Sequence, residues 1–145
     1  MPKQISEFLE LFTITPNIDI LDLNNGCDDI SKALNELVKP FDGKIVTINT
    51  QVLNELKIKV KRSSCEYGVI SNSILQSEDK HTLMKIITTA IRDSGYIVIL
   101  EEKEKSLEEI YELLEEFDFG AISSVDIFEK YNLIIGKKLH MWGMN

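Results

Sequence analysis

The sequence predicts a three-layer α/β/α sandwich, in which helices cover both faces of a mostly parallel sheet. Two observations predict it. Apolar residues recur with strand spacing and helix spacing in alternation along the chain, and the run Tyr96–Leu100 has the apolar character of a strand covered on both faces. The last two predicted strands follow each other closely, so the sheet ends in an antiparallel C-terminal hairpin. We expect seven strands in one domain, residues 1–145.

In the first half of the chain, segments with helical spacing of apolar residues alternate with segments that have strand spacing. The predicted elements are helix 5–12, strand 18–23, helix 30–38, strand 44–49, a short helix within 51–56 and strand 57–61. Pro16 and Pro40 stop the two longer helices, and Asp28 or Asp29 is available to cap the second of them. The last stretch alternates lysines with apolar residues, and a lysine row is typical of a strand at a sheet edge. A basic stripe for nucleic acid is the rival interpretation of these lysines.

The second half shows the same alternation. Its predicted elements are strand 67–72, helix 83–91, strand 96–100, helix 107–117, strand 122–128 and strand 131–141. Ser94-Gly95 ends the first of these helices, and Glu129-Lys130 joins the two strands of the hairpin. His140 and Trp142 are expected at the end of the last strand, where an aromatic ring commonly covers a sheet edge.

Composition and charge exclude several classes of protein. The net charge of −8 disfavours binding to a phosphate backbone, so we expect no nucleic-acid partner. No apolar run reaches the ~18 residues of a membrane-spanning helix and no signal peptide opens the chain, so we expect a cytoplasmic protein without membrane contact. Cys27 and Cys65 have no metal-ligand spacing; we expect free thiols, no disulfide between them and no metal.

The order of strands also predicts where a ligand would bind. In doubly wound sheets, ligands bind at the carboxyl ends of the strands, at the point where the strand order reverses. This rule selects the loop after the first strand, residues 24–28.

Two segments resemble the class I S-adenosylmethionine-dependent methyltransferases, and the resemblance covers almost the whole chain. Gly68–Leu75, followed by a helix and Gly95–Ile99, is similar to the fourth strand, fourth helix and fifth strand of that family. Ile20–Ser31 (ILDLNNGCDDIS) is similar, without gaps, to the family's cofactor motif. The resemblance implies a Rossmann-like fold and S-adenosylmethionine as the cofactor, with no metal.

Carried over residue by residue, the resemblance implies cofactor-binding positions at Asp22, Asn24, Gly26, Asn49 and Asn72. Several positions depart from the family pattern. Asn24 and Asp28 stand where the family has glycines, and Asn49 stands where it usually has an acid for the ribose hydroxyls. The connection between the second and fourth strands of the family is also short here, which removes much of the wall around adenine.

These departures leave two hypotheses. The leading one is a methyltransferase-like domain that has lost S-adenosylmethionine binding and acts as a non-catalytic binding or scaffold module, with a protein partner. The alternative is an active methyltransferase that modifies a small molecule or a protein, because methyl transfer depends mainly on proximity and alignment. The catalytic residues and the oligomeric state are left open.

Other polar residues have both a functional and a structural interpretation. His81 stands where a general base could lie, but a surface histidine near a helix start is more common. Cys27 could be a nucleophile, although no histidine lies near it in sequence. The segment from Glu101 to Asp118 holds nine acids and two lysines, which is typical of a solvated helix face and could also dock a basic partner.

Overall fold

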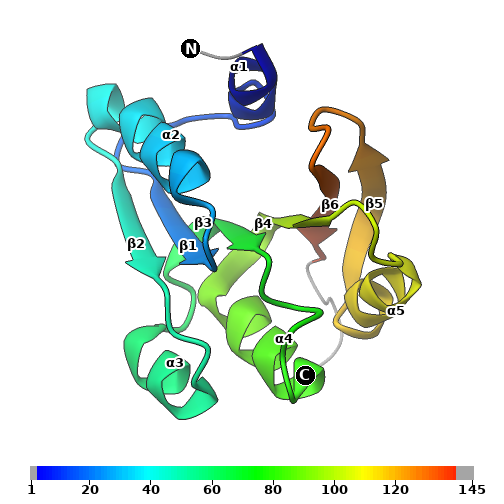
Figure 1. Cartoon of the computed structure of the whole chain (residues 1–145). Coiled ribbons are helices and arrows are strands. Elements are labelled where there is room, and N and C mark those ends of the chain that lie inside the picture. The colour runs from blue at the N-terminus through cyan, green and yellow to red at the C-terminus, as the bar shows by residue number, and fades with distance from the viewer. Residues whose placement is uncertain (1–2, 140–145) are drawn as a thin grey trace.

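The computed structural model describes residues 3–139, whose strands form one mixed sheet (Figure 1). The elements are α1 (Lys3–Leu9), β1 (Asp19–Asn24), α2 (Asp28–Val38), the 3₁₀ turn η1 (Lys39–Phe41), β2 (Lys44–Ile48), α3 (Leu53–Lys59), β3 (Cys65–Ser71), α4 (Lys80–Ala90), β4 (Ile91–Glu102), α5 (Glu108–Glu116), β5 (Phe119–Val125) and β6 (Tyr131–Lys138). His140 and Trp142 lie outside the described residues.

The strand order is β2-β1-β3-β4-β6-β5. The first four strands run parallel, with Leu21 of β1 level with Val46 of β2 on one side and Gly68 of β3 on the other. β6 runs antiparallel to both β4 and β5, so the C-terminal hairpin closes the sheet. The predicted fold class and its antiparallel hairpin are confirmed.

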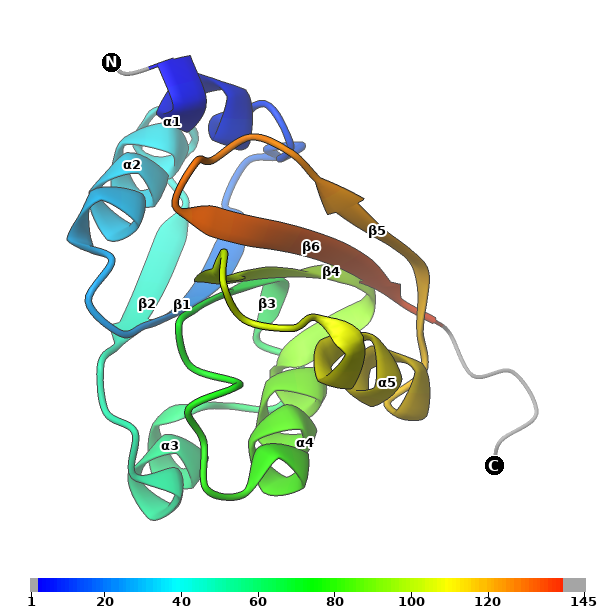
Figure 2. The ribbon, with the colours of Figure 1, turned by 45° about the vertical axis from the view of Figure 1, so that its right-hand side comes forward.

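Helices cover both faces of the sheet, as Figure 2 shows. The alternation of side chains along each strand divides the core in two. Ile20 of β1 packs in the cluster under α1 and α2, whereas Leu21 packs in the cluster under α3, α4 and α5. The two cysteines are both free and buried, and they lie in different clusters: Cys27 on the α2 side and Cys65 on the α4 side.

The expected edge strand at residues 57–61 is wrong, and the sheet of the described residues has six strands instead of seven. These residues form the end of α3 and the turn that follows it. Leu53, Leu56 and Val60 recur at helical spacing and pack against the α4-side cluster, with Leu56 only 2% exposed. The helix forms because it buries this apolar face, although lysines and apolar residues alternate as in a strand. Ile58 is left 83% exposed.

Three local expectations also need correction. α4 ends at Ala90 and not at Ser94-Gly95, because β4 begins at Ile91 and runs through that pair. β5 ends at Val125 and not at residue 128, because the Phe128 ring turns into the core and lies 5.6 Å from that of Phe8. The connection to β6 is therefore a loop of residues 126–130. At α2 the N-cap residue is Cys27, so both Asp28 and Asp29 lie in the first helical turn and neither is the cap.

Candidate functional site

The strand order reverses between β1 and β3, and the loops that follow these strands form the candidate site. From β1 the chain passes to β2, which pairs with one side of β1. It then returns to β3, which pairs with the other side of β1. Ligands of doubly wound sheets bind in the crevice at this switch point, beyond the carboxyl ends of the strands. Here the two loops at this point are residues 25–27 and the loop that begins at Asn72, and we call the position between them the crevice.

Asp22 is fully buried beneath this crevice, on the face of β1 that α2 covers. Its Oδ2 accepts hydrogen bonds from the hydroxyl of Ser31 in α2 and from that of Thr47 in β2, the latter at 3.1 Å. Its Oδ1 has no hydrogen-bond partner within residues 3–139. Burial raises the pKa of this carboxyl, and the hydrogen bonds from Ser31 and Thr47 oppose the rise. Asp22 therefore joins α2 and β2 to β1.

Asn24 uses its side chain to fix the loop that follows β1. Its Oδ1 accepts from the Cys27 amide at 2.7 Å, and its Nδ2 donates to the Cys27 carbonyl at 2.9 Å and to the Ser31 hydroxyl at 3.0 Å. The side chain is 2% exposed. Both its amide oxygen and its amide nitrogen are thus engaged within the chain. Gly26 is exposed and has φ +82°, a conformation that favours glycine, and a Cβ added there would meet nothing within 4 Å.

Asn25 connects the two rims of the crevice. Its backbone amide donates to the carbonyl of Ser71 at 3.1 Å, and its side-chain Nδ2 donates to the carbonyl of Asn72 at 3.0 Å. The loop after β1 is therefore hydrogen-bonded to the end of β3 by both backbone and side chain, directly across the switch point.

Asn72, Cys27 and Tyr131 make a second connection beside the first. Asn72 has φ +51°, and its Nδ2 donates to the Cys27 sulfur at 3.5 Å. The Cys27 thiol donates to the Tyr131 hydroxyl oxygen at 3.4 Å. Burial raises the pKa of this thiol, which keeps it in the weakly nucleophilic protonated form. The three side chains link the end of β3, the start of α2 and the start of β6.

The structure places Asp22, Asn24, Gly26 and Asn72 at the switch point, and Asn49 lies at the same carboxyl end of the sheet, since Ile48 before it is level with Leu23 of β1. Asn49 is exposed and directly follows β2. The hydroxyl of the next residue, Thr50, donates to Glu55 at 2.7 Å, which fixes the start of α3.

Sequence reasoning missed Asn25, Tyr131 and Glu101. Glu101 is 1% exposed near the end of β4; its Oε2 accepts from the Ile74 amide at 3.2 Å, and its Oε1 has no partner in the described part of the chain. Burial raises the pKa of this carboxyl. The signal for Glu101 is that it directly follows the apolar run of β4; nothing in the spacing of Tyr131 places it next to Cys27.

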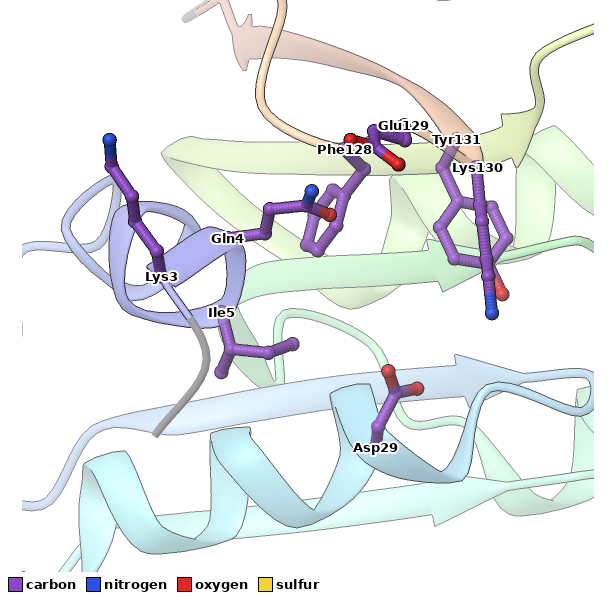
Figure 3. Close-up of a pocket in the computed structure, with 8 residues that line it drawn as sticks. All are labelled: Lys3, Gln4, Ile5, Asp29, Phe128, Glu129, Lys130 and Tyr131. Atoms are coloured by element: carbon purple, nitrogen blue, oxygen red, sulfur yellow. The ribbon is translucent and has the colours of Figure 1, made fainter.

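Two open cavities flank the crevice. One, of about 390 Å³, lies between α1, the start of α2 and the loop before β6 (Figure 3). Asp29 faces this space from one side, and Lys130 and Tyr131 face it from the other. A second cavity of about 550 Å³ lies between the loop after β2 and residues 76–78 after β3. Asp22 and Asn24 line neither cavity.

His81, the candidate general base, has a structural role. His81 is exposed, and its Nε2 lies 2.8 Å from a carboxylate oxygen of Glu116 in α5, so it ties α4 to α5. Over residues 3–139, no three or more histidine, cysteine and acidic side chains are grouped closely enough to hold a metal ion. Within the same range, no helix combines the length and the apolar character that crossing a membrane requires.

Comparison with solved structures identifies the fold. The chain is similar to a SAM-dependent methyltransferase from Aquifex aeolicus, with a TM-score of 0.73 and 12% identity over 93% of this chain and 89% of that one. It is also similar to an O-methyltransferase from Thermotoga maritima, with a TM-score of 0.72 and 13% identity over 97% of this chain and 66% of that one.

A third similar structure is a Haloferax volcanii complex that contains the Trm112 methyltransferase activator; its TM-score is 0.65, with 10% identity over 94% of this chain and 90% of that one. No protein-family model matches the sequence, and no curated protein matches it. The chain therefore has the fold of the class I S-adenosylmethionine-dependent methyltransferases, as the resemblance in its sequence predicted.

Proposed function

We propose that this chain is a methyltransferase-fold domain that does not bind S-adenosylmethionine and acts as a non-catalytic binding or scaffold module. The observation that carries the proposal is the bridge made by Asn25. Its hydrogen bonds to Ser71 and Asn72 hold the two loops together, so a ligand that separates these loops breaks them. The bond to Asn72 is exposed, whereas Ser71 is fully buried, and its carbonyl would need a new partner because an unpaired buried carbonyl is costly.

The residues around the bridge support the same conclusion. Asn24 adds a buried side chain where the family's backbone approaches its cofactor, and that side chain is fully engaged in the loop. Asp28 adds a carboxylate at the start of α2, where the cofactor's own carboxylate would be repelled. The β2–β3 connection holds only the short α3, so it supplies little of a wall for adenine. The residues present thus fit the cofactor poorly.

A protein partner accords with this role. One of the similar structures is a complex with a methyltransferase activator protein, so the fold can take part in protein assemblies. The net charge of −8 disfavours nucleic acid as the partner.

The first test is a thermal melt with and without a large excess of S-adenosylmethionine and, separately, of S-adenosylhomocysteine. A ligand at 100 times its Kd adds about 2.7 kcal/mol to stability, which for a domain of this size raises Tm by roughly 6 °C or more. We expect no rise with either compound. A Kd in the low micromolar range by calorimetry would overturn the proposal.

A variant that restores the two family glycines, Asn24→Gly with Asp28→Gly, tests the cause. If the loop alone prevents binding, this variant gains affinity for S-adenosylhomocysteine while the wild type shows none. The alternative, an active methyltransferase, requires the wild type to transfer a labelled methyl group from S-adenosylmethionine to a component of a cell extract. Such transfer would refute the non-catalytic role.

A further inference from the structure

The outer side of β2 is an open edge of the sheet. β2 pairs with β1 along its whole length, and no other strand of the described residues lies beyond it (Figure 1). Lys44, Val46 and Thr47 are also exposed, and Val46 keeps 53% of its surface accessible, whereas Ile48 is buried. An edge strand presents unpaired backbone N–H and C=O groups, which form a template for another strand.

An apolar groove of about 160 Å³ lies beside this edge, near the amino ends of β1 and β2. Leu21, Val46 and Cys65 give it apolar lining, and Lys44, Lys59 and Lys61 stand around it. The groove is therefore at the opposite end of the strands from the switch-point crevice. In β-strand addition, the backbone supplies hydrogen bonds and pockets for alternate side chains supply specificity. β2 offers the backbone groups, and the groove offers a pocket for side chains.

The charge around the groove is opposite to that of the whole chain. Residues 39–62 hold six basic and two acidic residues, whereas the chain as a whole carries −8. None of the ion pairs found within residues 3–139 involves Lys44, Lys59 or Lys61. The one acid that lines the groove, Asp19, is already paired with Arg92 at 3.2 Å. The groove thus presents uncompensated positive charge.

We propose that β2 accepts an extended, acidic segment of a partner protein as an added strand. Alternate apolar side chains of that segment enter the groove, and its carboxylates face the three lysines. A second copy of this chain would bring its own lysines to the same edge, where like charges repel. A nucleic acid would leave the strand edge and the apolar groove without partners. This inference names a partner class for the binding role proposed above, on a surface separate from the cofactor crevice.

The probe is a fluorescent seven-residue peptide of alternating glutamate and valine, titrated by fluorescence anisotropy. The controls are a lysine–valine peptide of the same length and the acidic peptide with proline at its centre, which cannot continue a ladder. We expect binding of the first peptide only, weakening as salt is raised because exposed charges are screened. Equal binding of all three peptides, or of none, would contradict the proposal.

Variants identify the surface. Lys44→Glu with Lys61→Glu should weaken peptide binding about tenfold, since each change replaces an attraction with a repulsion. Val46→Asp should abolish it by placing a charge in the apolar groove. The control is Lys32→Glu on the exposed surface of α2, which should leave binding unchanged. Unchanged binding in the two test variants would place the peptide elsewhere.

Two further measurements distinguish an acidic protein segment from a nucleic acid and from a second copy of this chain at the β2 edge. Displacement of the acidic peptide by single-stranded DNA at equal concentration would assign the edge to nucleic acid. A dimer in sedimentation that Val46→Asp dissociates would assign it to a second copy. Either result overturns the proposal. Because the cofactor melt concerns the crevice between β1 and β3, a protein that binds both S-adenosylmethionine and the peptide would refute only the non-catalytic role.

Discussion

Four polar side chains at the carboxyl end of the sheet each keep one buried oxygen without a partner in the described part of the chain: Asp22 Oδ1, Ser71 Oγ, Asn72 Oδ1 and Glu101 Oε1. Asp22 lies near the end of β1, Ser71 and Asn72 at the end of β3, and Glu101 near the end of β4. Burial of an unpaired polar oxygen costs free energy, and a buried charge costs more. The two carboxyls respond with raised pKa values, so their protonation contributes to folding.

The pKa of Glu101 gives a pH-dependent stability. A folded-state pKa above the unfolded value of about 4.5 means that its contribution is present below that pH and is lost as pH rises through the folded value. Glu101→Gln keeps an acceptor for the Ile74 amide and removes the charge. We expect the variant to exceed the wild type in unfolding free energy at pH 7, by roughly 1 kcal/mol, and to lose this advantage toward pH 4.

Urea unfolding monitored between pH 4 and pH 8 checks this prediction. Glu104→Gln, at an exposed position after β4, is the control and should follow the wild type at every pH. An advantage of Glu101→Gln that stays constant across this range would show that packing, and not ionisation, separates the two proteins.

The two thiols should be unreactive in the native protein. Both are buried, and burial raises the pKa of Cys65 to about 12 and that of Cys27 above its ordinary value. Since the thiolate is the reactive form, Ellman's reagent at pH 8 should label neither cysteine within minutes and both in guanidinium chloride. Rapid native labelling that Cys27→Ser removes would show that the crevice opens in solution.

For single residues, the sequence predicted the place of each residue in the fold better than the contacts of its side chain. Asp22, Asn24 and Gly26 lie where the alignment put them, because one loop follows one strand. Their partners come from elsewhere: Thr47 is 25 residues from Asp22, and Tyr131 is 104 residues from Cys27. Local spacing carries no information about such pairs, so the Asn25 bridge and the Tyr131 contact needed the structure.

Among the elements, α3 is where two periods compete. Ile58 and Val60 share one face if residues 57–61 form a strand, whereas Leu56 and Val60 share a face if they form a helix. The helix is found because it buries Leu56 against the α4-side cluster. Most other helices and strands were predicted within about three residues at each end. β4 is an exception, because it begins at Ile91, which the sequence placed in the preceding helix, and runs through Ser94-Gly95.

Alanine substitutions distinguish the two arrangements by their energies. Leu56→Ala removes a side chain that is 2% exposed and should cost about 2–4 kcal/mol of unfolding free energy. Ile58→Ala changes a side chain that is 83% exposed and should stay within about 0.5 kcal/mol of the wild type. Chemical denaturation measures both values. A cost above about 1.5 kcal/mol for Ile58→Ala would favour the edge strand instead.

In the whole molecule, charge is distributed unevenly. Residues 101–118, which include α5, hold nine acids and two lysines, whereas residues 39–62 around β2 hold six basic and two acidic residues. The two segments lie toward opposite edges of the sheet, as the strand order and Figure 1 show. Repulsion within the acidic segment should therefore matter more for stability than the net charge of −8 alone.

Two substitutions with the same change in net charge separate these effects. Glu112 is exposed on α5 and has acidic residues three and four positions away in both directions, so Glu112→Lys replaces repulsion with attraction and should stabilise by roughly 1 kcal/mol at low salt. Glu36→Lys on α2 places its new lysine four residues after Lys32 and should give no gain. Melts at low and at high salt measure both, and the gain of Glu112→Lys should shrink as screening increases. Equal stabilisation by the two substitutions would mean that net charge governs, and that the segregation of charge between α5 and the β2 edge adds little to stability.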